Sequence, residues 1–516
     1  MRFPKFKKLY LTAVLILLTA FLLVLSFPPV NSEFFSWLAF VFLFFALRNK
    51  SKTKAFLTAY VCGIIFWIGN IYWLANVTIL GLILLAAYLA IYFAIFGLVI
   101  NRYSLLSTRY SIFAVPSLWV LLEYLRSHLL TGFGWGLLGY SQYLNLPIIQ
   151  IADITGIWGV SFLVMMVNVT FYRVMGFGLR VTQRTIKGKN LLLSVTLPAL
   201  LLLLSLGYGF YKLSRTPDPG SRIPIRISVI QGNIPQVIKW QEYAKEQILG
   251  QYLFFSQRAL LDNPDLVIWP EAALPGIPYY DPDIIGKVEG FFGDSGVPLL
   301  TGVVNQDNNI YYNSAVLISG AKSPMQRYDK LHLVPFGEYI PFREVLTFLE
   351  TVVPIGDFQA GKEYTIFSCP ISEGVMRFSV LICFEDIFPQ ISRQFVKGGA
   401  DFLVNITNDA WFGDTSSPYQ HSAASVFRAV ENGVYLVRSA NTGVSGFISP
   451  SGELYPLAKE ESGRQTFISG HKSKDIFLKK NSPTLYVRLG DWFILTCGII
   501  AICGICKVKK REKLDA

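Results

Sequence analysis

The chain has 516 residues, of which 52% are hydrophobic, 15% aromatic and only 16% charged. An ordinary soluble domain carries roughly a quarter charged residues, so this composition excludes a disordered chain and argues against a purely soluble protein. The net charge of +12 raises the question of a nucleic-acid partner, and the positions of the basic residues decide it.

Twenty of the 46 Lys and Arg residues lie in five short segments beside apolar runs. These segments are residues 2–8, 48–54, 102–109, 173–189 and 507–513. Together with the end of the C-terminal tail they contain only two acids, which leaves the rest of the chain with 26 basic and 32 acidic residues. Lys and Arg concentrated beside apolar runs mark cytoplasmic loops of membrane proteins, so a membrane is predicted as a partner and nucleic acid is not.

Eight apolar stretches are candidates for membrane-spanning helices. A span needs about 20 mostly apolar residues, because each residue rises about 1.5 Å through a hydrocarbon core about 30 Å thick. The second and fifth stretches are short for this. The stretches lie near residues 9–26, 34–47, 55–75, 78–100, 111–126, 156–175, 191–211 and 489–506.

The loop charges predict the topology. With the N-terminus inside, the loops after the second, fourth and sixth helices are cytoplasmic, and these loops are basic. The first stretch ends in Ser26-Phe27-Pro28-Pro29 without a small-residue cleavage site, so a retained helix is expected rather than a signal peptide. In the loop at 127–155, Trp135 and Tyr140 are typical of interfacial aromatic residues, and lining a lipid entry route is the alternative for them.

Three parts are therefore expected. Residues 1–211 form a membrane domain with seven helices, residues 212–488 form an extracytoplasmic domain, and residues 489–516 form a C-terminal transmembrane helix with a basic cytoplasmic tail. The predicted location is the cell membrane, or the inner membrane of a Gram-negative cell.

The sequence pattern changes after residue 225. Short β-branched runs alternate with turn signals and with helical stretches near 240–261 and 419–432, which is typical of strands buried on both faces. An α/β or layered α+β sandwich is predicted. The predicted strands are 225–231, 265–269, 297–303, 314–318, 378–383, 401–405, 435–438 and 445–448.

Two of the six cysteines, Cys369 and Cys383, lie in this outer domain. A disulfide between them is possible in an oxidising compartment, although the surroundings of Cys383 argue against it. The chain has no C-x-x-C pair suited to zinc, and its four histidines are scattered, so neither a metal nor a cofactor is predicted.

Three reactive side chains stand at the ends of apolar runs: Glu271, Lys330 and Cys383. A thiol of pKa about 8.5 is a weak nucleophile unless a base removes its proton or a cation lowers its pKa, and Lys330 is expected to supply that cation. Taken singly, the cysteine is more typical of a core position, the glutamate of a cap and the lysine of a solvated charge. Together, they predict an acyl acceptor with a carboxylate base and an ammonium for the oxyanion.

The motifs around these residues resemble the nitrilase superfamily, and more closely the apolipoprotein N-acyltransferases, its membrane-embedded members. The long segment from Lys330 is the most specific of them. The motifs are Gln231-Gly-Asn-Ile-Pro-Gln, Trp269-Pro-Glu271, Tyr311-Tyr-Asn313-Ser, Lys330-Leu-His-Leu-Val-Pro-Phe-Gly-Glu338-Tyr-Ile-Pro, Cys383-Phe-Glu385 and Asn408-Asp-Ala-Trp-Phe.

The resemblance implies an αββα sandwich beside the membrane helices and a role for each matching residue. Glu271 matches the general base, Lys330 the electrostatic stabiliser and Cys383 the nucleophile. The other matches are Glu338 and Glu385, two further essential carboxylates, and Trp240, Asn313 and Phe384, residues that form the site. The residue after the nucleophile is commonly Tyr, so Phe384 lacks a hydroxyl that the family often has.

The function implied by the resemblance is ping-pong acyl transfer without a cofactor. The donor is a phospholipid, and the acceptor is the α-amino group of the diacylglyceryl-cysteine at the N-terminus of a lipoprotein. A monomer is expected. Two alternatives remain at this point: a membrane-tethered amidase that uses water as the acceptor, and a non-catalytic lipoprotein-binding module.

Overall fold

The computed structural model describes residues 5–103, 105–108, 110–179, 188–215, 223–277, 281–319, 325–340, 358–372, 374–459, 461–478 and 483–514. Pro341 of the long motif and residues 180–187 of the fourth basic segment lie outside these ranges. The chain divides into two compact units, one of Met1–Arg215 with Leu489–Ala516 and the other of Thr216–Arg488.

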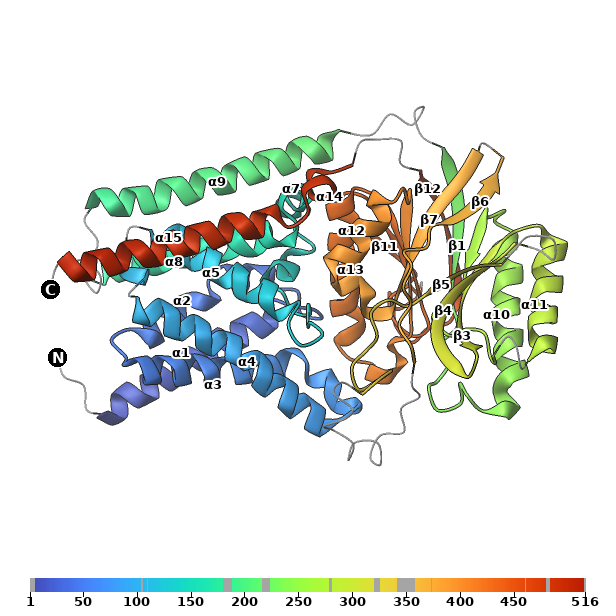
Figure 1. Ribbon diagram of the computed structural model, residues 1–516, viewed down its shortest axis with the longest axis horizontal. Coiled ribbons are helices and arrows are strands. Elements are labelled where there is room, and N and C mark those ends of the chain that lie inside the picture. Colours follow the sequence, from blue (N-terminus) through green and yellow to red (C-terminus); the bar gives the residue numbers. More distant parts are fainter. Residues whose placement is uncertain are drawn as a thin grey trace. The chain divides into compact units, whose positions relative to one another are not determined.

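A helix occupies each of the eight predicted apolar stretches (Figure 1). Among the described residues, α1, α4, α8 and α9 contain segments long and apolar enough to cross a membrane, and the other four are shorter or less apolar. The helices are α1 (Lys5–Leu25), α2 (Ala39–Leu47), α3 (Lys52–Asn70), α4 (Ile79–Arg102), α5 (Ser111–Arg126), α8 (Ile157–Gly178), α9 (Gly188–Ser214) and α15 (Trp492–Leu514).

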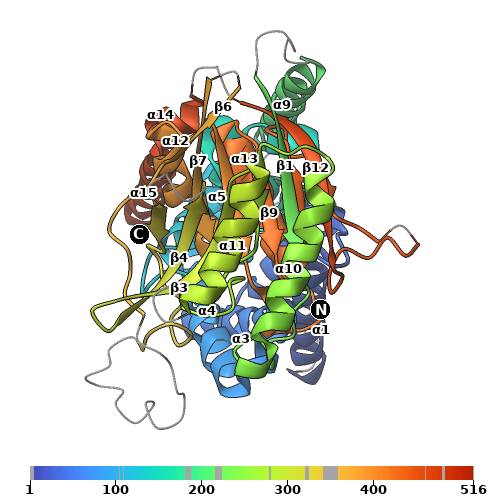
Figure 2. The ribbon, with the colours of Figure 1, turned by 90° about the vertical axis from the view of Figure 1, so that its right-hand side faces the viewer.

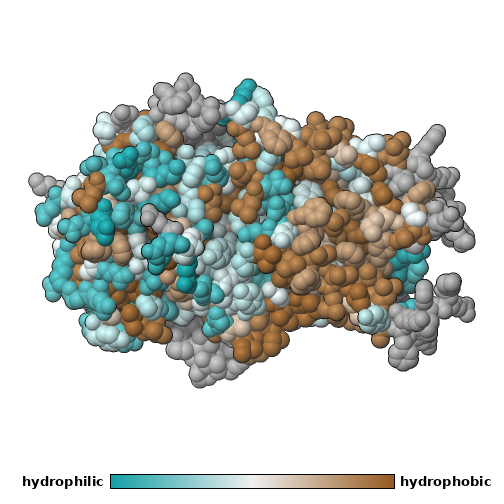
Figure 3. Space-filling model, turned by 180° about the vertical axis from the view of Figure 1, so that it is seen from behind, coloured by the Kyte–Doolittle hydropathy of each residue, from teal (hydrophilic) through white to brown (hydrophobic). Residues whose placement is uncertain are grey.

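Large apolar side chains point outward from this helical unit. Exposed examples are Phe21 on α1, Leu84 on α4 and Leu203 on α9. Figure 3 shows hydrophobic residues gathered over the helical unit, which in that view lies to the right. Exposed apolar patches of this size are rare on soluble proteins. The unit identifies the chain as a membrane protein.

The loop after α5 is folded into the helical unit. The Arg126 guanidinium donates hydrogen bonds of 2.7 Å to the carbonyls of Phe133 and Trp135, and a Glu123 carboxylate oxygen accepts from the Leu138 N–H at 2.6 Å. Trp135 and Tyr140 are buried. The expectation that these two aromatic residues face the membrane interface is therefore wrong: the paired polar groups of α5 hold the loop inside.

The second unit is a four-layered αββα sandwich (Figures 1 and 2). The first sheet has the order β12-β1-β2-β3-β4-β5, and the second the order β11-β10-β9-β8-β7-β6. In each sheet three neighbouring strands run parallel, β1-β2-β3 and β7-β8-β9, and the remaining pairs are antiparallel. All eight predicted strands are present, and β5, β6, β11 and β12 are additional.

The strand and helix bounds of this unit are as follows. The first sheet contains β1 (Pro224–Gln231), β2 (Leu266–Ile268), β3 (Leu299–Asp307), β4 (Ile310–Ile318), β5 (Gln326–Asp329) and β12 (Gly470–Phe477). The second contains β6 (Phe367–Ile371), β7 (Gly374–Ile382), β8 (Phe402–Thr407), β9 (Leu436–Ala440), β10 (Gly446–Ile448) and β11 (Leu454–Pro456). The helices are α10 (Lys245–Leu260), α11 (Pro282–Ser295), α12 (Pro389–Lys397) and α13 (Ser417–Asn432).

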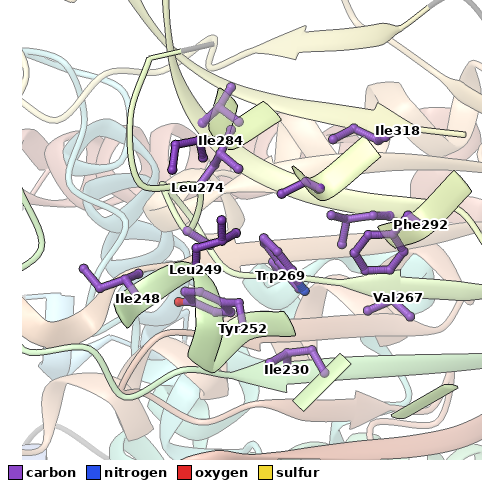
Figure 4. Packing of buried hydrophobic residues seen from close by; sticks show 14 of the residues in the cluster. Ile230, Ile248, Leu249, Tyr252, Val267, Trp269, Leu274, Ile284, Phe292 and Ile318 are labelled. Atoms are coloured by element: carbon purple, nitrogen blue, oxygen red, sulfur yellow. The ribbon is translucent and has the colours of Figure 1, made fainter. Parts of the chain in front are cut away.

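Helices α10 and α11 cover the first sheet through a core centred on Trp269 (Figure 4). The Trp269 ring stacks on Tyr252 of α10 at 4.9 Å between centroids and meets Phe292 of α11 edge-on at 5.9 Å. Its indole N–H donates to the Ser256 hydroxyl at 2.8 Å. Trp269 stands two residues before Glu271, so this packing fixes the backbone that presents the carboxylate.

The reactive residues follow the carboxyl ends of strands in both sheets. Glu271 comes shortly after β2, Lys330 follows β5, Cys383 follows β7 and Asn408 follows β8. Ligands and catalytic groups in α/β sheets lie beyond such strand ends, because the chain there leaves the sheet in loops.

Gly302 of β3 should be intolerant of a side chain. A Cβ there would lie 2.5 Å from the Ala272 nitrogen and 2.6 Å from the Glu271 Cα, and backbone atoms cannot move aside cheaply. We expect Gly302→Ala to reduce stability by about 1–3 kcal/mol and to displace Glu271. The midpoint of thermal unfolding measures the effect.

The control is Gly290→Ala in the interior of α11, where the added Cβ meets open space. It should leave the midpoint unchanged or raise it, because Ala is favoured over Gly in a helix by roughly 0.5–1 kcal/mol. Equal midpoints for the two variants would contradict the close approach at Gly302.

Candidate active site

Cys383 is the first residue of a short 3₁₀-helix, Cys383–Ile387, and directly follows the last residue of β7 in a sharp turn. Its φ is +54°, a left-handed conformation that costs an L-residue roughly 1–2 kcal/mol. Two donors hold its carbonyl, the Asn405 side-chain amide at 2.8 Å and His421 Nε2 at 3.2 Å. The turn leaves the residue Cys383 partly exposed, and neighbouring groups stabilise its strained backbone.

The buried residues Glu271, Lys330 and Asn313 form one polar cluster with Glu338, which is partly buried. The Asn313 amide donates at 2.7 Å to one oxygen of Glu271 and at 2.7 Å to one oxygen of Glu338. The Lys330 ammonium donates to the same Glu338 oxygen at 2.9 Å and lies 3.7 Å from the Glu271 oxygen. The second Glu271 oxygen accepts from the backbone N–H of Asn408 at 2.8 Å.

The electrostatics keep the lysine charged and the cysteine protonated at rest. Burial lowers the pKa of Lys330, but the carboxylates of Glu338 and Glu271 outweigh it and raise the pKa above its usual range. Burial raises the pKa of the Cys383 thiol well above its ordinary value, and the charge of Glu271 adds to this, while Lys330 opposes it. Lys330 therefore acts in the expected direction without producing a resting thiolate, so attack requires a base.

Glu385 joins the Cys383 turn to the segment that follows β5. One of its oxygens accepts from the backbone N–H groups of Leu331 at 2.7 Å and His332 at 3.0 Å, and the other accepts from the Ile382 N–H at 2.7 Å. The Tyr328 hydroxyl lies 2.9 Å from both. Burial raises the pKa of Glu385 to about 7. The Glu385 side chain therefore links the backbone of Ile382, just before Cys383, to the backbone of Leu331 and His332.

The two predicted aromatic residues differ in their surroundings. The Phe384 ring lies 5.4 Å from the Lys330 ammonium and packs edge-on against Phe388 and His332. Trp240 is half exposed. The structure brings Glu271, Lys330, Glu338, Asn313, Phe384, Cys383 and Glu385 together and leaves Trp240 at the surface.

Lys239, next to Trp240, is a site residue that sequence reasoning missed. It is buried, and its ammonium donates to the backbone carbonyl of Glu271 at 3.1 Å. Burial lowers its pKa to about 8, against the opposing charges of Glu271 and Cys383. A lysine in a polar turn is usually solvated, so the sequence carried no signal for this contact except proximity to a predicted site residue.

The arrangement suits acyl transfer through a thiol. Asn313 and Asn408 hold the Glu271 carboxylate in one orientation, the Lys330 ammonium is a fixed positive charge, and Cys383 is partly exposed. Acyl transfer through a thiol needs a base, a positive charge for the oxyanion and a nucleophile, and these three groups are of the right chemical types. Both Cys369 and Cys383 are free thiols, and Cys369 is buried on β6. Among the described residues, no group of three or more His, Cys, Asp or Glu side chains is suited to a metal ion.

Comparison with known protein families gives two matches. Residues 19–170 match the model of the apolipoprotein N-acyltransferase N-terminal domain, and residues 226–468 match that of the carbon-nitrogen hydrolases. The second match, over the sandwich, agrees with the predicted nitrilase-like fold.

Two relatives match over nearly the full length, and a solved structure matches about half of the chain. An apolipoprotein N-acyltransferase of Geobacter metallireducens is 39% identical, covering 96% of this chain and 95% of the relative. One of Methylococcus capsulatus is 32% identical, with 98% and 97% covered. A solved amidase of Nesterenkonia sp. is 17% identical, covers 53% of this chain and 95% of its own, and has a TM-score of 0.37.

Replacing Glu385 should weaken the unit measurably. In Glu385→Gln an amide nitrogen would face N–H donors, and each buried donor left without an acceptor costs about 1–3 kcal/mol. We expect a lower midpoint of thermal unfolding and slower alkylation of the Cys383 thiol by chloroacetamide. Glu363→Gln, a change at an exposed carboxylate, is the control. A midpoint for Glu385→Gln equal to that of the control would show that the four donors do not depend on this carboxylate.

Proposed function

The chain belongs to the apolipoprotein N-acyltransferase family, and we propose that it transfers a fatty acyl chain from a membrane phospholipid to the α-amino group of an N-terminal diacylglyceryl-cysteine. The observation that carries the chemistry is the hydrogen-bonded group of Glu271, Asn313, Glu338 and Lys330 beside a protonated Cys383 thiol. The family relation favours an amine acceptor over the water acceptor of an amidase and over a binding module.

The first half-reaction forms the acyl-enzyme. Glu271 takes the thiol proton as the Cys383 sulfur attacks the ester carbonyl carbon, and Lys330 stabilises the oxyanion that forms. When the intermediate collapses, the C–O bond to the glycerol breaks and the departing oxygen takes the proton from Glu271. The products are a thioester and a lysophospholipid.

The second half-reaction transfers the acyl group. The acceptor amine attacks the thioester carbonyl carbon, and Glu271 takes a proton from the nitrogen. The C–S bond breaks as the amide forms, and the sulfur recovers its proton from Glu271. Glu271 thus serves in both steps, and Cys383 returns to the protonated state that its burial favours.

We also propose the membrane arrangement. Residues 1–211 form a multi-pass domain, residues 212–488 lie on the extracytoplasmic side, and residues 489–516 return the chain to the cytoplasm. The basic loops between apolar helices support this orientation. Phospholipid and lipid-anchored acceptor both reside in the membrane, so both substrates reach the enzyme by lateral diffusion.

A fatty acyl adduct on Cys383 is the direct test of the thioester. Intact-mass and peptide mass spectrometry of the purified protein incubated with phospholipid should show the adduct. Cys383→Ser should lose the adduct and the transfer to a lipopeptide amine, because an alcohol is a far weaker acid than a thiol and this carboxylate activates it poorly.

Cys369→Ala is the matched control, and it should keep both the adduct and the transfer, because Cys369 is buried on β6. Substantial turnover by Cys383→Ser would remove the thioester mechanism. Equal loss in Cys369→Ala would mean that the nucleophile is misassigned.

Labelling with a membrane-impermeant thiol reagent tests the topology. A cysteine introduced at exposed Asp283 should react from outside intact cells or spheroplasts. A cysteine at exposed Lys52, the first residue of α3 in the basic segment 48–54, should react only after the membrane is opened. The reverse pattern would refute the proposed orientation.

A further inference from the structure

A second set of buried charges includes one member, His421, that contacts the backbone of Cys383. It consists of Asp386, Asp409, His421 and Arg438, each at most 1% exposed. They come from four different segments: the 3₁₀-helix after Cys383, the 3₁₀-helix Asp409–Phe412, α13 and β9. The mechanism proposed above gives these residues no role.

The ring of His421 lies between two carboxylates. Its Nδ1 is 3.0 Å from an oxygen of Asp409, and its Nε2 is 2.9 Å from an oxygen of Asp386. Ionised carboxylates only accept hydrogen bonds, so both ring nitrogens must carry protons and the ring is an imidazolium. With Arg438 donating to the other Asp386 oxygen at 2.9 Å, two cations balance two anions in a water-excluded cluster.

The same Nε2 of His421 also lies 3.2 Å from the carbonyl oxygen of Cys383. This carbonyl belongs to the residue with the left-handed φ of +54°, and such strain persists only where the surroundings hold it. The imidazolium therefore links the buried charges to the turn that orients the thiol.

We propose that His421, held as an imidazolium by Asp386 and Asp409, is a positioning residue that fixes the nucleophile turn of Cys383. The inference rests on the proposed function in that it takes Cys383 as the nucleophile. It extends that function by one further residue, which does not touch the reacting atoms.

Several other groups face this ring or its partners. Ser425 of α13 donates to Asp386, Thr407 of β8 lies 3.4 Å from Asp409, and Arg428 of α13 donates to the Asp386 backbone carbonyl at 3.1 Å while pairing with Glu431 at 2.7 Å. Burial lowers the pKa of His421, but Asp386 and Asp409 outweigh it and raise the pKa to about 9, with Arg438 opposing.

The sign of the pH effect follows from that shift. The folded-state pKa lies above the ordinary value near 6.5, so the stabilisation by the charged ring is complete below about pH 6.5 and is lost as the pH rises through about 9. A neutral ring has a single N–H and cannot donate to both carboxylates, so at alkaline pH it loses one of the two contacts that orient it against the turn.

The test measures how fast Cys383 is alkylated by chloroacetamide, with peptide mass spectrometry separating this thiol from the others. This reaction needs no acyl donor. We expect His421→Gln to slow it at least tenfold at pH 7.5. The control His471→Gln, at a partly exposed histidine on β12, should stay within twofold of the unmodified protein. A folded His421→Gln protein alkylated at the unmodified rate would overturn the proposal.

Asp409→Asn keeps the ring and provides the answer if His421→Gln fails to fold. Removing the Asp409 charge lowers the pKa of Cys383, which by itself would speed alkylation. It also removes one of the two anions that hold the proton on His421. We expect Asp409→Asn to be alkylated more slowly than the unmodified protein at pH 9. Alkylation of the variant faster than that of the unmodified protein throughout pH 7.5 to 9 would overturn the proposal.

Acyl transfer to a lipopeptide amine is measured in the same preparations. The saturating rate should fall in His421→Gln with the KM for phospholipid within twofold, because the substrate contacts remain. If the unmodified protein transferred no acyl group while its alkylation still depended on His421, the proposed function would fail and the positioning role would stand.

Discussion

The site depends on the pairing of the buried Lys330 ammonium with the carboxylates of Glu338 and Glu271. Removing a charge from water costs several kcal/mol unless opposite charges and hydrogen bonds replace the solvent, so a lysine that is 1% exposed requires carboxylates beside it. Glu338 and Glu271 meet this need, and Asn313 donates to both. Because Glu271 follows β2 of the first sheet and accepts from the N–H of Asn408 after β8 of the second, the same set of contacts holds the two sheets together at their carboxyl ends.

Cys383 lies between two balanced sets of charge. Glu271 and Glu338 are matched by Lys330 and Lys239, and Asp386 and Asp409 are matched by Arg438 and His421. With each set near neutrality, neither stabilises a permanent thiolate, in agreement with the raised pKa of the thiol. A protonated cysteine is poorly reactive toward stray electrophiles. In the proposed mechanism it becomes nucleophilic only when a bound ester carbonyl accepts the charge beside Lys330.

The sequence predicted the parts of the fold that are apolar and missed the parts that are polar. The eight predicted strands are interior ones or have a clear β-branched pattern, whereas edge strands such as β12, with Lys472, Lys474 and Asp475, carry charges that suppress the hydrophobic signal. The site shows the same division. Glu271 and Cys383 each end an apolar run and Lys330 opens the most specific motif. By contrast, Lys239 lies in a turn, and His421 meets Asp386 and Asp409 only through the fold. Contacts between distant segments leave no local pattern.

The geometry of Glu271 explains how one carboxylate can serve in two successive proton transfers. A carboxylate has about four lone-pair positions on its two oxygens. Asn313 occupies a position on one oxygen and the Asn408 N–H a position on the other, so the group is fixed in orientation while each oxygen keeps a position for a proton. Neither donor belongs to a substrate, and the same orientation is available after the lysophospholipid leaves and the amine arrives. In the proposed mechanism, a base held by the protein on both oxygens needs no rearrangement between the half-reactions, so the proposed thioester would pass to the amine without a delay that lets water in.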